Sequence, residues 1–151
     1  MFAAILISTP VQAGEEIGWR GFALPRLSDR MGLPAASVVL GVLWAAWHIP
    51  LFFSTAGDTY GQSFPVYLVG VTALSVVLAW LYWRSGGSLI LTMFAHAAIN
   101  NTKDIVPSVS TPSDSPWNLS ASPIAWIAAG VLWLVAGALL LQMRGAQRAR
   151  S

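Results

Sequence analysis

Long apolar runs divide the sequence into segments of the length that crosses a membrane. Residues 34–56, 64–83, 88–106 and 124–143 are mostly apolar. Each contains about the 20 residues that an α-helix needs to span a hydrocarbon core of about 30 Å. Residues 107–123 hold four of the nine prolines together with many Ser and Thr, which is typical of a loop. The pattern predicts an all-α, multi-pass transmembrane helical bundle of about four to five spanning helices.

The N-terminal stretch is apolar on both sides of two adjacent glutamates. Residues 1–24 surround Glu15 and Glu16 and end near Pro25, so we expect a further helix that carries charge inside the membrane. A secretory signal peptide is the alternative, because residues 11–13 resemble a small-residue cleavage site. The stretch lacks a basic n-region and its apolar part is short, so a helix of the mature protein is favoured.

The composition indicates a membrane environment. Hydrophobic residues make up 56% of the chain and charged residues 9%, whereas a soluble domain has about 25% charged residues. The absence of Cys excludes disulfides, cysteine zinc sites and thiol nucleophiles. The net charge is +2, and the basic residues form no run beside an aromatic platform, so we expect no nucleic-acid partner. We expect the lipid bilayer as the partner instead.

The basic residues predict the orientation, because cytoplasmic loops retain Lys and Arg. Alternating spans place six arginines on one face. They are Arg26, Arg30, Arg84, Arg144, Arg148 and Arg150. We therefore expect an integral protein of the cell membrane with this face and the C-terminus in the cytoplasm. Residues 1–143 would form a single transmembrane domain with its motif region at about 10–106, and residues 144–151 a short basic cytoplasmic tail.

Ionisable side chains inside the predicted spans mark the candidate site, because charge is costly in the bilayer and usually marks a function or a buried pair. Glu16 and Arg20 are four residues apart, so they can pair on one helix face. Glu15 lies about 100° around the same helix and lacks that partner.

Two imidazoles and an amide are predicted at a similar depth. His48 follows Trp44 by four residues, and His96 and Asn100 are also four apart. From the cytoplasmic helix ends, Glu16 lies about 15 Å deep at 1.5 Å per residue. His96, Asn100 and His48 lie about 12, 18 and 20 Å deep by the same measure. Three segments therefore bring their rare polar groups to one level near the middle of the membrane.

Two carboxylates, two imidazoles and an amide indicate hydrolysis, because they can activate water and stabilise an oxyanion. Glu15, His48 and His96 could instead bind zinc, whose bound water would then be the nucleophile. Three non-catalytic interpretations stay open at this point. They are a structural ion pair, hydrogen-bonded core histidines, and the proton relay of a small transporter.

Three motifs in this order resemble the CPBP or Abi family of intramembrane proteases, which includes the endopeptidase that trims prenylated CAAX proteins. The family motif Glu-Glu-x-x-x-Arg reads here as Glu15-Glu16-Ile17-Gly18-Trp19-Arg20. The motif Phe-x-x-x-His reads as Trp44-Ala45-Ala46-Trp47-His48, with Trp keeping an orienting aromatic at the Phe position. The motif His-x-x-x-Asn reads as His96-Ala97-Ala98-Ile99-Asn100. Each motif is weak alone, whereas the ordered set is specific.

The resemblance implies an intramembrane endopeptidase with a polar cavity open to the cytosol. Glu15 and His48 would activate the attacking water, while His96 and Asn100 would hold the oxyanion. Glu16 and its arginine would fix the geometry. The resemblance favours a glutamate mechanism without a cofactor, with zinc as the alternative. The substrate would be a peptide or protein at the membrane, lipidated in the CAAX enzymes.

One departure from the family concerns the N-terminus. Family members have further spanning helices before the first motif, whereas here only fourteen residues precede Glu15. This indicates an N-terminally truncated chain or a misplaced start codon. Without the missing helices, the cavity wall would be open or supplied by a partner. The same departure motivates the alternative function, which is a non-catalytic bacteriocin-immunity or membrane scaffold protein of the same fold.

Overall fold

The computed structural model describes residues 2–102, 115–119 and 122–148, which form helices joined by turns, with no strand among them. This confirms the predicted all-α class. In chain order the elements are α1 (Phe2–Glu16), the π-helix η1 (Ile17–Ala23), α2 (Leu24–Met31), α3 (Leu33–Trp47), the 3-10 helix η2 (Ile49–Phe53), α4 (Phe64–Arg84), α5 (Leu89–Asn100) and α6 (Pro123–Arg148).

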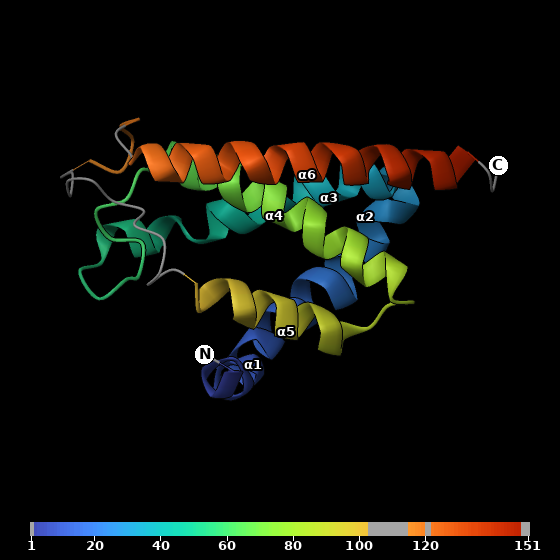
Figure 1. The fold of residues 1–151 in the computed structure, drawn as a ribbon, viewed down its shortest axis with the longest axis horizontal. Helices are drawn as coiled ribbons and strands as arrows, with labels where there is room; N and C mark the ends of the chain where they lie inside the picture. Colours follow the sequence, from blue (N-terminus) through green and yellow to red (C-terminus); the bar gives the residue numbers. More distant parts are fainter. Residues whose placement is uncertain (1, 103–114, 120–121, 149–151) are drawn as a thin grey trace.

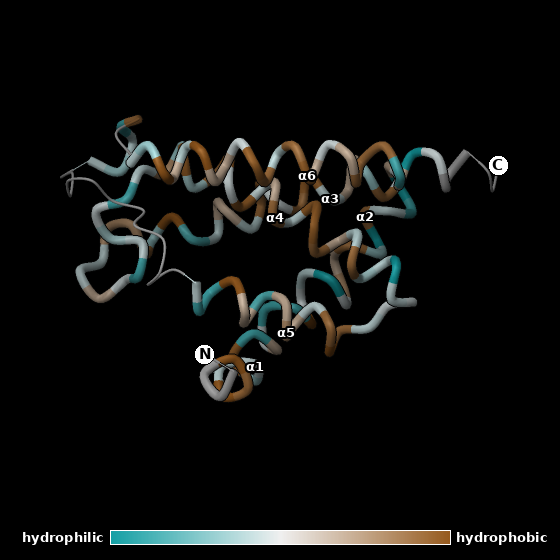
Figure 2. The backbone as a smooth tube through the Cα atoms, in the orientation of Figure 1, coloured by the Kyte–Doolittle hydropathy of each residue, from teal (hydrophilic) through white to brown (hydrophobic). Residues whose placement is uncertain are grey.

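Three helical segments of the described chain are long and apolar enough to cross a membrane. They are Leu33–Phe53, Phe64–Arg84 and Pro123–Gly145. The last of these leaves large apolar side chains uncovered, with Leu134 77% exposed. Apolar colours dominate α6 in Figure 2 and give way to hydrophilic ones near its C-terminal end. Such a surface suits lipid, since hydrocarbon does not penalise an exposed Leu.

The helices lie in two groups (Figure 1). In one group, α4 packs against both α3 and α6, and α2 packs against α3. In the other, α1 packs against α5, and α1 is seen nearly end-on while α6 lies across the view. The π-helix η1 connects the two groups, because it follows α1 directly and continues into α2.

Small residues allow α3 and α4 to approach closely. A side chain on Gly41 would lie 2.7 Å from the Thr72 Cα atom and 2.9 Å from the Ser75 Cβ atom. Ser75 donates its hydroxyl to the backbone carbonyl of Ser37 at 3.0 Å, and both serines are fully buried. Small residues and interhelical hydrogen bonds of this kind associate helices within a membrane.

The prediction that the first helix ends near Pro25 was wrong. The chain stays helical from Phe2 to Met31, and Gly32, with a φ of 79°, ends it. The helix changes register before the proline, because the Leu24 N–H reaches the Trp19 carbonyl five residues back. Pro25 then occupies the first turn of α2, where a residue without a backbone N–H is tolerated.

Two other predicted boundaries differ from the structure. The helix predicted over 88–106 is α5, which ends at Asn100 and is 12 residues long, about 18 Å. The helix predicted over 124–143 continues through Arg148. The predicted loop is irregular at residues 115–119, while Lys103, Asp104 and the other residues of 103–114 lie outside the described part of the chain.

Candidate active site

Glu16 is a buried carboxylate that contacts residues of two motifs. It is fully buried at the end of α1. Its Oε1 accepts hydrogen bonds from Arg20 Nη1 at 2.7 Å and from His96 Nδ1 at 2.9 Å. The predicted Glu16–Arg20 ion pair is therefore present. Because the carboxylate oxygen accepts the bond from Nδ1, the Nε2 atom of His96 is left for other contacts.

Arg20 is held between this carboxylate and an aromatic ring. Its guanidinium carbon lies 4.5 Å from the ring centre of Trp44, which is within cation–π range. Arg20 is fully buried, and its Nε and Nη2 atoms make no hydrogen bond within the described chain. Arg20 belongs to η1, and π-helical turns occur frequently at functional sites.

Trp44 joins the three motifs. Its Nε1 donates a hydrogen bond to Glu15 Oε2 at 2.8 Å, and its ring meets the His96 ring edge-on with the centres 5.0 Å apart. The Trp44 ring also lies 6.1 Å from the His48 ring. A Phe at this position would supply the ring contacts but no donor for Glu15. The replacement of Phe by Trp therefore adds a contact that the sequence analysis did not anticipate.

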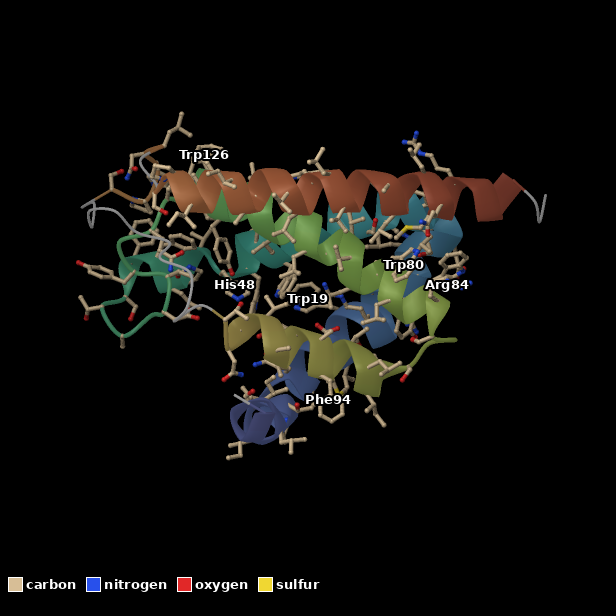
Figure 3. The ribbon with its side chains drawn as sticks, in the orientation of Figure 1. Trp19, His48, Trp80, Arg84, Phe94 and Trp126 are labelled. Atoms are coloured by element: carbon tan, nitrogen blue, oxygen red, sulfur yellow. The ribbon has the colours of Figure 1, made fainter. Side chains whose placement is uncertain are left out.

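His48 lies at the corner where α3 ends and η2 begins. Its Nδ1 atom is 2.9 Å from the Trp44 carbonyl oxygen. A carbonyl oxygen only accepts, so Nδ1 carries the proton and the neutral ring keeps Nε2 as an acceptor. Figure 3 shows His48 and Trp19 in the middle of the molecule, between the long helices and α5. Trp80 and Arg84 lie toward one end of α4 in the same view.

Two neighbouring amides at the end of α5 have different surroundings. Asn100 lies one turn after His96 and is half-buried. Asn101 donates to Ser8 Oγ at 2.9 Å and to the Ala97 carbonyl at 2.8 Å. Asn101 belongs to none of the three motifs, and its bond to Ser8 ties α5 to α1. The structure thus brings Glu15, Glu16, Arg20, Trp44, His48 and His96 into one contact network, with Asn100 beside it.

A groove opens beside Glu15. Its volume is about 620 Å³. It is lined by Val11, Gly14, Glu15, Gly18, Trp19, Phe22, Ala23 and Trp47. A Cβ atom on either glycine would meet nothing within 4 Å, so the helix backbone is accessible there. Glu15 is the acidic residue of this otherwise mainly apolar lining, so a bound molecule would meet a carboxylate.

The residues named for zinc do not form a metal site in this structure. Within the described residues, no three His, Cys, Asp or Glu side chains gather closely enough to hold a metal ion. Glu15, His48 and His96 each contact Trp44 instead.

Comparison with known proteins identifies the family. A sequence model of the Rce1-like type II CAAX prenyl endopeptidases matches residues 1–102, which include all three motifs. The CAAX prenyl protease 2 of Methanococcus maripaludis is 30% identical over 98 residues, which are 61% of this chain and 36% of that protein. The chain thus covers little more than a third of this relative's length. The match confirms the resemblance seen in the motifs, and with the apolar helices it supports an integral membrane protein. The chain belongs to the Rce1-like family of type II CAAX prenyl endopeptidases.

Proposed function

We propose that the protein is an intramembrane endopeptidase that hydrolyses a peptide bond with a water molecule activated by Glu15 and His48. The observation that carries this proposal is the different engagement of two adjacent carboxylates. Glu16 accepts from a guanidinium and an imidazole, whereas Glu15 accepts one indole N–H and lines the groove. A pair of groups in such different environments can divide the roles of base and structural anion.

In the proposed reaction, Glu15 accepts a proton from water as the water oxygen attacks the carbonyl carbon of the substrate. His48 offers Nε2 as the second acceptor, because its Nδ1 is occupied by the Trp44 carbonyl. The tetrahedral intermediate breaks its C–N bond, and the proton passes to the leaving amine. One water molecule is consumed, and a carboxylate and an amine are released.

The developing oxyanion requires donors, and we assign this role to His96 and Asn100. The Asn100 side-chain amide can donate without any change of charge. His96 already donates through Nδ1 to Glu16, so it can donate through Nε2 only when the ring is doubly protonated. The Glu16 carboxylate fixes the orientation of the His96 ring through this bond, which gives the Glu16–Arg20 pair a positioning function.

The groove beside Glu15 is proposed to hold the substrate. Gly14 and Gly18 let a peptide backbone approach the helix, while Trp19, Phe22 and Trp47 offer apolar contacts. The name of the relative indicates a first substrate class to test, which is a membrane protein tail ending in a prenylated CAAX sequence. We propose that this site is reached from the cytoplasmic side, with the C-terminus on the same side.

The test uses purified protein in lipid nanodiscs with prenylated and unprenylated CAAX peptides, followed by mass spectrometry in water enriched in oxygen-18. We expect cleavage at one bond, with the heavy oxygen in the new carboxylate and loss of cleavage in His48→Gln. Activity in metal-free protein with a chelator supports the glutamate mechanism, whereas rescue by zinc supports the metal alternative. If no peptide is cut, the endopeptidase proposal is contradicted and the scaffold alternative is favoured.

A further inference from the structure

Three aromatic rings surround the His48 imidazole. The ring centres of Trp44, Trp47 and Tyr67 lie 6.1, 5.0 and 5.6 Å from that of His48. The two tryptophans precede His48 in its own helical segment, so they move with it. Tyr67 belongs to α4, and its ring therefore fixes His48 relative to a different helix.

The backbone at His48 does not hold the side chain in place by itself. His48 is the C-terminal cap of α3, and its N–H reaches the Ala45 carbonyl at 3.1 Å, three residues back. The chain then tightens into η2, so His48 stands where one helix type changes to another. Helix ends fray more readily than helix interiors, and a side chain there needs contacts from elsewhere to keep one rotamer.

Tyr67 contacts both sides of this corner. Its ring lies against His48, and it meets the Phe52 ring of η2 edge-on with the centres 5.1 Å apart. Tyr67 itself is anchored in the first turn of α4, where its N–H reaches the Ser63 carbonyl at 3.0 Å. Ser63 also caps α4 by accepting from the Val66 N–H. Tyr67 is therefore a half-buried ring on a well-anchored turn, clamped against the corner that carries His48.

We propose that Tyr67 is a positioning residue for His48. Its ring keeps the imidazole in the rotamer in which Nδ1–H donates to the Trp44 carbonyl, which leaves Nε2 free as an acceptor. The ring carries this role and the hydroxyl does not, because the contacts to His48 and Phe52 are between rings. The inference rests on the proposed function only in assigning proton transfer to Nε2.

The chain offers a direct readout, because it contains two histidines. Protein labelled with nitrogen-15 histidine gives two sets of imidazole nitrogen signals in NMR spectra, one for each ring, and His96→Gln assigns them. We expect His48 to be the Nδ1–H tautomer in the native chain and in Tyr67→Phe. In Tyr67→Leu we expect a mixture of tautomers at His48. The His96 signal should not change, which shows that the fold is intact.

Tyr82→Leu is the matched control, because Tyr82 is a half-buried tyrosine of the same helix whose hydroxyl lies near Gly87. It should leave both histidine signals unchanged. If Tyr67→Leu does not fold, Tyr67→Met retains apolar volume without a ring and takes its place. A pure Nδ1–H tautomer in a folded ring-free variant would overturn the inference. A Tyr67→Phe variant as perturbed as Tyr67→Leu would also overturn it, since the hydroxyl would then be responsible.

Cleavage kinetics give a second readout. We expect Tyr67→Leu to lower kcat by about 10-fold or more, with KM little changed, and Tyr67→Phe to restore it. The two proposals fail separately. A native protein that cuts nothing but shows the Tyr67-dependent tautomer contradicts the endopeptidase proposal alone. An active protein whose His48 tautomer and kcat are the same in Tyr67→Leu contradicts the positioning role alone.

Discussion

Trp44 donates its indole N–H to Glu15 across 2.8 Å, and this bond joins the helix of the first motif to the helix of the second. The adjacent carboxylate of Glu16 is bound to Arg20 and His96 instead. Two neighbouring glutamates therefore have separate partners, and Trp44 contacts both sets of residues through its N–H and its ring. This separation is the structural basis for assigning Glu15 as the base.

Trp44→Phe tests the value of the indole donor, because it retains the aromatic ring and removes the N–H. A hydrogen bond to a charged acceptor contributes about 1.5–3 kcal/mol. We expect a lower unfolding midpoint for this reason, and kcat to fall by about 10- to 100-fold if the bond also positions Glu15. Steady-state cleavage assays and thermal unfolding measure the two quantities. An unchanged kcat would show that the indole bond does not position the base.

The Glu16–Arg20 pair should matter for folding as well as for chemistry. Both side chains are fully buried, so removing one leaves an unpaired charge at a cost of about 3–5 kcal/mol. We expect Glu16→Leu and Arg20→Met each to reduce the free energy of unfolding by this order in detergent micelles. The double variant should lose less than the sum, with a coupling of about 2 kcal/mol. Additive losses would mean that the two residues act independently.

Asn100 and Asn101 form a natural control pair. Asn101 holds the end of α5 through two hydrogen bonds, so Asn101→Ala should lower the free energy of unfolding by about 1–2 kcal/mol. Asn100→Ala should instead lower kcat by about 10²- to 10³-fold, as expected for loss of an oxyanion donor, with stability nearly unchanged. The reverse pattern, with Asn101 controlling the rate and Asn100 the stability, would refute the assignment.

Because α3 and α4 are in close contact at Gly41, we expect replacement of this glycine to destabilise the fold. Gly41→Ala places a methyl group 2.7 Å from the Thr72 Cα atom, so the helices must separate at a cost of about 1–3 kcal/mol. Gly70→Ala on α4 is the control, since a Cβ there meets nothing within 4 Å. We expect a lower midpoint of unfolding for the first variant and no loss for the second. Equal midpoints would contradict the packing described.

Local pattern was sufficient to predict most of the helices. The apolar runs at 34–56, 64–83 and 124–143 correspond to the three spanning segments, because length and hydropathy follow directly from the bilayer. The spacing of Glu16 and Arg20 also predicted their ion pair, because residues four apart share a helix face.

Contacts between distant segments could not be predicted from spacing. Trp44 is 29 residues from Glu15 and His96 is 80 residues from Glu16, so their bonds depend on how the helices pack. Tyr67 belongs to no motif, and only the packing of α4 against α3 brings it to His48. The π-helix at Ile17–Ala23, which changes the hydrogen-bond register just before Pro25, also has no signal in the hydropathy pattern.

The single-turnover cleavage rate of Glu15→Gln in nanodiscs tests directly whether Glu15 is the base. Gln has the same shape and can still accept the Trp44 N–H, so the variant removes the base and leaves the network in place. We expect a rate at least about 10³-fold below that of the native protein, with unchanged peptide binding and unfolding midpoint. A rate within a few-fold of the native value would contradict the assignment of Glu15 as the base.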